Sequence, residues 1–424
     1  MESRMTNQLW LGPSARYVCW TLIAIAYGVA FLQRMAPLTM VDQLLADLGM
    51  SAAGFSTLVA AYFVGYTAMQ FPAGVLVDVF GVRAVILSSL AISLAGTFGF
   101  SLAADVVSAS FYRVIVAAGD ALVFSCLLKF SASSFSNSKF GLISGMSQVA
   151  GYVGGIVATV PLAIAAKTVG WRGCSAGIAT LLLSCFVLLF IFLPRDTGAV
   201  PLRARIAGTL SVARQAVASR TSWGLALAFA GHFASITSLS GAWAVVLLSQ
   251  AYGQTTVEAA TLMMYFMVAT LVGSIAFGHL SDITSSLFRT LTLISTLRSL
   301  GLVALAPMVG SGLLNTHPGW TLAVIGVFAG GTVPLVLKCL KKIYEAKNIG
   351  IGGAMNATVS GILMVLAQPV IAAIAGCQSC AGAEVRAMQF SPTGLNVVMI
   401  FLAALSFLSV VGALLMRDRL GASK

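Results

Sequence analysis

Residues 54–103 read GFSTLVAAYFVGYTAMQFPAGVLVDVFGVRAVILSSLAISLAGTFGFSLA, and Asp78 and Arg83 are the only charged residues among them. The apolar runs at 54–76 and 84–103 each approach the roughly 20 residues that a helix needs to cross a bilayer. Both runs are continuous rather than alternating, which favours helices over the strands of a membrane barrel. The stretch therefore predicts two membrane helices joined by a short polar turn.

The rest of the chain has the same character. Of its 424 residues, 59% are apolar and 8% are charged, whereas about a quarter of an ordinary soluble domain is charged. This composition excludes a soluble enzyme, a disordered chain and a collagen-like chain. We expect an all-α membrane protein with twelve transmembrane helices. The expected spans are 17–37, 54–76, 84–103, 108–130, 141–165, 172–193, 222–248, 257–277, 290–310, 319–339, 350–375 and 393–415.

The basic residues predict the orientation of these spans, because Lys and Arg accumulate on the cytoplasmic side. With both termini cytoplasmic, sixteen of the 24 Lys and Arg fall in inside segments and three in outside loops, while five lie within spans. The net charge of +12 is therefore mainly a topology signal and gives no support to nucleic-acid binding. We expect a multi-pass protein of a prokaryotic inner (plasma) membrane, embedded in the lipid bilayer.

A basic stretch divides the spans into two sets of six. Residues 194–221 carry five arginines and one acid, and we expect a cytoplasmic linker between bundles at 1–193 and 222–424. We interpret its basic face as an anchor at the membrane surface rather than as a specific lipid site. The sets also repeat: Lys129 lies twelve residues before Gly141, and Lys338 lies twelve before Gly350. The sequence therefore predicts two pseudo-symmetric halves, as in many transporters.

The loop after span two resembles a known family motif. Gly74-Val-Leu-Val-Asp78-Val-Phe-Gly81-Val-Arg83 resembles the motif G-x-L-x-D-x-x-G-x-[RK] of the major facilitator superfamily, and Gly278-His-Leu-Ser-Asp282 repeats its first part after span eight. Residues 113–119 resemble the fourth-helix Arg…Gly motif of that family. The resemblance covers essentially the whole chain and implies transport by alternating access. It also implies that these loop residues lock one conformation, whereas the alternative is a plain polar turn. The residues expected in this gating role are Gly74, Asp78, Gly81, Arg83 and Asp282.

Ionisable groups inside spans suggest the charge of the substrate. Such groups cost about 2.5–3.5 kcal/mol each and normally face a cavity or a partner. The sequence places five basic groups against one carboxylate there, namely Arg34, Arg113, Lys129, Arg298 and Lys338 against Asp120. A cavity with this excess attracts an anion.

Arg34 is one candidate substrate ligand. Its surroundings, Phe31-Leu-Gln-Arg34-Met-Ala-Pro37, resemble the first helix of the organophosphate–phosphate exchangers and related anion symporters, in which an arginine of this helix holds the substrate phosphate. The alternative is that Arg34 extends to the outer headgroups. The exchangers also use an arginine in their seventh helix, and span seven here has no Arg or Lys.

Further candidates lie in both halves. Lys129 and Lys338 occupy equivalent places in spans four and ten and could grip one anion from both sides, or could only extend to the cytoplasmic surface. Gln148 in span five and Asn356 in span eleven are polar candidates on the substrate path.

Two groups could carry protons. Asp120 lies seven residues after Arg113, two helical turns away on nearly the same face, so it either exchanges protons or forms a structural pair with Arg113. His232 in span seven could also titrate, or could be a hydrogen-bonding residue of the helix packing.

Taken together, these patterns predict a monomeric secondary transporter for a small organic anion, coupled to protons or acting by exchange. Binding is expected near the midplane between the halves, without a cofactor or a metal, and no nucleophile–base set suggests an enzyme. The alternatives are a carrier of another solute, such as a drug, peptide or metallophore, and a transporter-like membrane sensor. Cys377 and Cys380 in the last outer loop could form a disulfide or remain two thiols.

Overall fold

The helices described here come from a computed structural model of the chain. It describes residues 12–194, 202–240, 256–284, 286–306, 318–374 and 392–417, and all regular structure within these ranges is helical. The cysteines Cys377 and Cys380 and the two chain ends lie outside the described residues. The five cysteines within them are buried and form no disulfide with one another, as expected of small core residues.

The chain forms two compact units. The first comprises Met1–Ser136, Val149–Gln215 and Tyr344–Ala354, and the second comprises Asn137–Gln148, Ala216–Ile343 and Met355–Lys424. The first unit therefore includes a short segment from the second half of the sequence, and the second unit includes a short segment from the first half.

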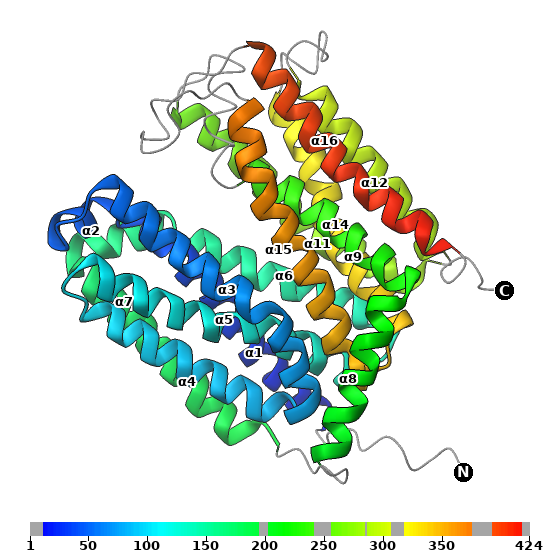
Figure 1. Ribbon diagram of the computed structural model, residues 1–424, viewed down its shortest axis with the longest axis horizontal. Coiled ribbons are helices and arrows are strands. Elements are labelled where there is room, and N and C mark those ends of the chain that lie inside the picture. Colours follow the sequence, from blue (N-terminus) through cyan, green and yellow to red (C-terminus); the bar gives the residue numbers. More distant parts are fainter. Residues whose placement is uncertain are drawn as a thin grey trace. The chain divides into compact units, whose positions relative to one another are not determined.

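In unit 1, α5 is the central helix, since it packs against α1, α3 and α4 (Figure 1). Asp105 caps its N-terminus by accepting a hydrogen bond from the Ser108 amide at 2.8 Å, and this bond holds the pKa of the Asp105 carboxyl below its usual range. The helices of this unit are α1 (Pro13–Thr39), α2 (Val41–Asp47), α3 (Ala52–Phe80), α4 (Val82–Ser101), α5 (Val106–Ser134), α7 (Val160–Phe192) and most of α8 (Leu202–Ala218).

In unit 2, α14 packs against α9, α11 and α12, and α16 packs against α9 and α12. Met263, Phe266, Leu302 and Leu402 belong to one buried apolar cluster of this unit. Its helices are α9 (Arg220–Ser238), α11 (Thr256–Ile283), α12 (Leu287–Ala304), α14 (Pro318–Ile343) and α16 (Pro392–Leu415). Two helices begin in one unit and end in the other: α6 (Phe140–Val157) and α15 (Ile349–Ile374).

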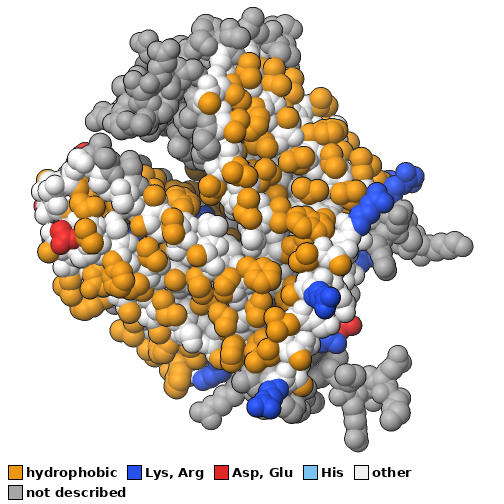
Figure 2. Space-filling view, viewed as in Figure 1, with side chains coloured by type: hydrophobic (Ala, Val, Ile, Leu, Met, Phe, Trp, Pro, Cys, Tyr) orange, Lys and Arg blue, Asp and Glu red, His pale blue; other side chains and the backbone are white. Residues whose placement is uncertain are grey.

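The helices agree closely with the expected spans. Within the described residues, eleven helices are long and apolar enough to cross a membrane. The span expected at 222–248 begins as α9, and its remainder extends beyond the described residues. Many large apolar side chains face outward, including Val64 at 65% and Ile191 at 64% exposure, and the visible outer faces are mostly apolar (Figure 2). Such a surface suits lipid rather than water.

The region of expected spans five and six contains two breaks. The sequence predicts spans at 141–165 and 172–193. One break lies within the first of these, where α6 ends at Val157 and α7 begins at Val160, and the other lies at Gly170, between the two expected spans. Pro161 explains the earlier break, because it lies in the first turn of α7, where its missing amide donor is not needed. Gly170 then takes a φ of 72° inside α7 and interrupts its helical geometry.

Candidate functional site

A buried polar network in unit 1 surrounds Asp120. Its Oδ1 accepts hydrogen bonds from Gln33 Nε2 at 2.9 Å and from Ser93 Oγ at 2.7 Å, and its Oδ2 accepts one from the Tyr62 hydroxyl at 3.0 Å. Gln33 in turn accepts a hydrogen bond from Thr97. These residues come from α1, α3, α4 and α5, so one carboxylate links four helices of the unit.

The arrangement of α4 and α5 explains how Asp120 reaches these partners. Ser89 Oγ of α4 donates a hydrogen bond to the carbonyl of Gly119 at 2.8 Å, immediately before Asp120 on α5. This bond fixes the register of the two helices at that point. Ser93 follows Ser89 by four residues, one turn further along the same face of α4, and therefore lies beside the carboxylate.

Two arginines border the same network. Arg113 Nη1 donates a hydrogen bond to the carbonyl of Gln33 at 2.9 Å, and its guanidinium lies 4.5 Å from the centre of the Tyr62 ring. The guanidinium of Arg34 lies 4.7 Å from the Phe31 ring centre and 4.6 Å from that of Tyr66. The Nε atom of Arg34 is buried and makes no hydrogen bond to a described residue. The cluster thus holds two guanidinium groups and one carboxylate.

Arg113 and Asp120 were expected on one helix face, either as a direct pair or with Asp120 free to exchange protons. None of the ion pairs among the described residues joins them. Gln33 connects them instead, since its carbonyl accepts from Arg113 and its side-chain amide donates to Asp120. This arrangement leaves the proton-carrying role of Asp120 as a prediction.

A second cluster in unit 1 contains Asp78. Its Oδ1 lies 2.5 Å from Lys129 Nζ, and its two oxygens accept hydrogen bonds from the amides of Gly350 at 3.2 Å and Ile351 at 2.9 Å. Lys129 also donates to the carbonyl of Lys347 at 2.8 Å. A carboxylate at the first amides of a helix satisfies donors that the helix itself leaves unpaired. Asp78 therefore ties the end of α3 to the start of α15.

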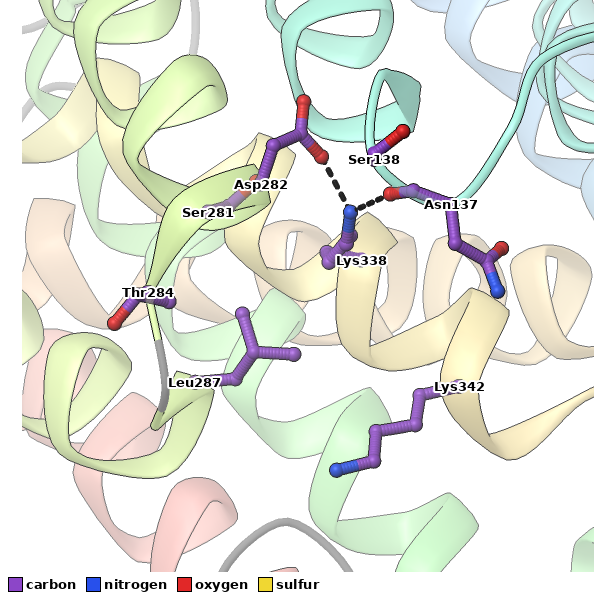
Figure 3. Close-up of a pocket in the computed structure, with 8 residues that line it drawn as sticks. All are labelled: Asn137, Ser138, Ser281, Asp282, Thr284, Leu287, Lys338 and Lys342. Carbon is purple, nitrogen blue, oxygen red and sulfur yellow. Dashed lines mark hydrogen bonds and ion pairs between the residues drawn. The ribbon is translucent and has the colours of Figure 1, made fainter. Parts of the chain in front are cut away.

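The same pattern occurs in unit 2 around Asp282. It accepts hydrogen bonds from the amides of Gly141 and Leu142, both at 2.9 Å, and it forms an ion pair with Lys338, which also donates to the Asn137 carbonyl. Figure 3 shows Lys338 pointing toward Asp282 and Asn137. The residues around this pair line a cavity of about 380 Å³: Asn137, Ser138, Ser281, Asp282, Thr284, Leu287, Lys338 and Lys342.

The loop after α3 has the geometry that its glycines suggest. Gly81 takes a φ of 83°, a conformation that favours glycine. A Cβ on Gly74 would lie 2.2 Å from the carbonyl oxygen of Gly350, so this position must be a glycine for α3 and α15 to approach so closely. Arg83 Nη2 donates to the Phe190 carbonyl at 2.7 Å. The gating role of these residues, and the substrate contact expected of Lys129 and Lys338, stay predictions.

His232 lies in another environment. Its Nδ1 is 3.1 Å from Nη1 of Arg298, which is fully buried and also donates to Thr332, Ser406 and Ser409. An arginine has no acceptor capacity, so the Nδ1 of His232 accepts this hydrogen bond. His232 is therefore a hydrogen-bond acceptor within the helix packing of unit 2 in this structure, and its role as a proton carrier stays a prediction.

The two amide candidates are buried in unit 2 with unused donors. Asn356 and Gln148 are 3% and 7% exposed, and neither Asn356 Nδ2 nor Gln148 Nε2 donates a hydrogen bond to a described residue. A buried donor without an acceptor costs free energy. A ligand that accepts a hydrogen bond from it would remove this cost, so both amides suit contact with a ligand.

Some members of the Asp120 cluster were not expected from the sequence. Tyr62 is 1% exposed and its ring stacks on that of Tyr66, with centroids 6.0 Å apart. The two tyrosines are four residues apart, on one face of α3. This spacing within a membrane span is the sequence feature that could have identified Tyr62 as a member of the cluster. Among the described residues no group of three or more His, Cys, Asp or Glu side chains could hold a metal ion.

Comparison with known proteins identifies the family. The model of the Major Facilitator Superfamily matches residues 23–368. The hexuronate transporter of Escherichia coli (strain K12) is 25% identical, and the match covers 94% of this chain and 87% of that protein.

Solved structures show the same fold. A crystal structure of FucP, a transporter of this superfamily in the outward conformation, has a TM-score of 0.72 at 15% identity and covers 96% of this chain and 99% of its own. The proton:xylose symporter XylE has a TM-score of 0.68 at 17% identity, with 96% of each chain covered. The chain therefore belongs to the Major Facilitator Superfamily, whose twelve-helix fold in two domains it shares, and is a multi-pass membrane transporter rather than an enzyme.

Proposed function

We propose that this transporter moves a small organic anion by alternating access. The observation that carries the proposal is the position of Arg34, whose guanidinium lies beside the rings of Phe31 and Tyr66 and whose Nε has no described hydrogen-bond partner. Rings beside the guanidinium favour the cation, and its Nε–H still lacks an acceptor among the described residues. A carboxylate is the complementary ligand, since it can accept two parallel hydrogen bonds from an arginine.

The local charge supports an anion. Arg34 and Arg113 border a network that contains one carboxylate, Asp120, so an empty site has an excess positive charge when Asp120 is ionised. Burial makes this charge costly, and an anionic substrate would compensate it. A neutral sugar would leave it unbalanced.

The name of the sequence relative supports a proposal for the chemical class of the substrate. The protein that is 25% identical to this chain is named a hexuronate transporter, and a hexuronate joins a carboxylate to a hydroxyl-rich ring. We therefore propose sugar acids as the first substrates to test. The unused amide donors of Asn356 and Gln148 suit hydroxyl groups, and Lys129 and Lys338 are proposed as further contacts in other states of the transport cycle.

Asp120 is the proposed proton carrier, if transport is coupled to protons rather than to exchange. As an ionised group it accepts three hydrogen bonds. A protonated carboxyl has a hydrogen to donate, so protonation would make one hydroxyl partner, Tyr62 or Ser93, reverse its bond and accept, or turn away. Tyr62 could transmit this change, because its hydroxyl bonds Asp120 and its ring centre lies 5.9 Å from the Arg34 guanidinium.

The two aspartate clusters are the proposed gates. Asp78 and Asp282 each combine an ion pair to a lysine with hydrogen bonds to the first amides of a helix. Opening would require both kinds of contact to separate. We further propose that the protein is a monomer in an inner (plasma) membrane, with both termini in the cytoplasm.

A ligand-stabilisation assay tests the substrate class. Purified protein should unfold at a higher temperature with glucuronate or galacturonate, and not with glucose, fucose or xylose, because only the acids can pair with Arg34. Arg34→Gln should need a roughly 10- to 150-fold higher ligand concentration for the same rise in unfolding temperature. This is the range for loss of a hydrogen bond to a charged group.

Arg289→Gln is the matched control, because Arg289 is an exposed arginine outside this cluster. It should respond to the sugar acids as the parent does. Equal stabilisation by neutral sugars, or a full response of Arg34→Gln to the acids, would refute the proposed contact.

A further inference from the structure

The linker helix α8 (Leu202–Ala218) carries two kinds of exposed side chain on neighbouring faces. Ile206 and Leu210 are 39% and 56% exposed, and they are about 40° apart around the helix axis at 3.6 residues per turn. Arg203 and Arg214 are also exposed, and each lies within about 80° of this apolar pair. We call these four residues the α8 stripe. Three arginines and no acidic residue occur in the whole helix.

The opposite and inner faces of α8 differ from the stripe. Arg205 Nη1 donates to the carbonyl of Val79 at 2.9 Å, and Thr209 is 5% exposed, so one face packs against unit 1. Val79 lies in the last turn of α3, where a membrane span ends. Ala204 and Gln215, roughly opposite to Ile206, are small or polar and exposed. The α8 stripe therefore lies next to the face that is fixed at the end of a span.

The structure points to an occupant for the α8 stripe: we propose that it docks on the anionic phospholipid surface of the cytoplasmic leaflet. Interfacial helices bury a narrow apolar face at the boundary between headgroups and acyl chains, and their flanking basic residues reach the phosphates. The space-filling view shows apolar and basic side chains next to one another along α8 (Figure 2). The inference goes beyond substrate transport and uses only the proposed cytoplasmic orientation.

Charge complementarity favours lipid over the other possible occupants. A second copy of this chain would bring its own basic stripe, since the chain has 24 Lys and Arg against 12 Asp and Glu. The cytoplasmic leaflet is negatively charged and attracts basic segments near the membrane. Docking would also hold the connection between the two units at a fixed depth.

Hydrogen–deuterium exchange of the full-length protein in nanodiscs tests the proposal. Amides of residues 202–215 should exchange more slowly when phosphatidylglycerol is added to phosphatidylcholine. The two arginines together should raise the equilibrium constant for docking of α8 on the anionic membrane by at most about 25-fold, because each basic residue near an anionic surface contributes about fivefold. High salt should remove the difference, because the Debye length falls to about 3 Å at 1 M.

Three variants complete the test. Arg203→Gln/Arg214→Gln should remove the lipid response, and Ile206→Ser/Leu210→Ser should reduce protection in both membranes. Arg289→Gln, an exposed arginine of α12, should respond as the parent does. Equal exchange in the two membranes, or a lipid response that survives loss of both stripe arginines, would overturn the proposal. If protection instead rises with protein concentration in detergent, the α8 stripe binds a second copy of the chain, and the lipid proposal is equally overturned.

Discussion

Asp120 is held by dipoles rather than by a neighbouring cation. Hydroxyl and amide donors from three other helices reach its two oxygens, and none of the ion pairs among the described residues includes it. Such a group can gain or lose a proton without breaking a salt bridge. Asp78 and Asp282 differ, since each is paired with a lysine and would have to give up that pair on protonation.

Replacing Asp120 by Asn tests its role as a proton carrier. Asn cannot titrate, so proton-driven accumulation of substrate should be lost and the pH dependence of uptake should disappear. Substrate exchange across the membrane needs no proton carrier and should continue. Uptake and counterflow measured at several pH values separate the two processes.

Asp105→Asn is the control for this change, because Asp105 is an exposed cap outside the membrane spans. It should leave both uptake and counterflow as they are in the parent. Accumulation that still follows the proton gradient in the Asp120→Asn protein would remove Asp120 from the coupling mechanism.

At the scale of single residues, the sequence identified most charged members of the site but not their partners. Arg34, Arg113 and Asp120 stand out because charges are rare in membrane spans. Tyr62 and Gln33 do not, because an aromatic or amide side chain in a span is common and its importance arises only when helices distant in sequence meet. For the same reason, the sequence did not show that Gln33, rather than a direct contact, links Arg113 to Asp120.

At the scale of elements, close helix approach depends on a few glycines. Gly74→Ala places a methyl group 2.2 Å from the carbonyl oxygen of Gly350, which is too close, and a backbone atom cannot rotate away. The change should destabilise the protein by about 1–3 kcal/mol, the usual cost of overpacking, and should lower its unfolding temperature in detergent.

Gly155→Ala provides the comparison, because a Cβ there meets no atom within 4 Å. Ala is a better helix former than Gly by about 0.5–1 kcal/mol, so this variant should be as stable as the parent or slightly more stable. If Gly74→Ala and Gly155→Ala unfolded at the same temperature, the close contact of α3 with the start of α15 would not contribute to stability.

The helices were largely predictable from the sequence, because continuous apolar runs of about 20 residues have few alternatives in a membrane. The expected span at 319–339 corresponds to α14 at Pro318–Ile343. The break at Gly170 falls between expected spans five and six, whereas the additional break between α6 and α7 was not predicted, since apolar residues continue through it and only the position of Pro161 marks it. The short helix α2 (Val41–Asp47) was missed for a related reason: it lies outside the spans, and hydropathy does not report it.

At the scale of the whole molecule, the compact units do not follow the expected halves everywhere. Residues 137–148 belong to unit 2 and residues 344–354 to unit 1. The repeat in the sequence accounts for this exchange: Asp78 binds the amides of Gly350 and Ile351, and Asp282 binds those of Gly141 and Leu142. The spacing that revealed the repeat could not show which half each helix start would join. The division at residues 194–221 stays a prediction.

The central claim, that the chain carries a small organic anion, is tested most directly by uptake into proteoliposomes. Radiolabelled glucuronate should accumulate with time, unlabelled sugar acids should compete with it, and glucose should not. Arg34→Gln should lower this uptake at least about tenfold at a low substrate concentration, and Arg289→Gln should preserve it. Binding of the acid without any uptake would show a sensor instead of a carrier, and transport of neutral sugars or cations that is independent of Arg34 would contradict the anionic substrate.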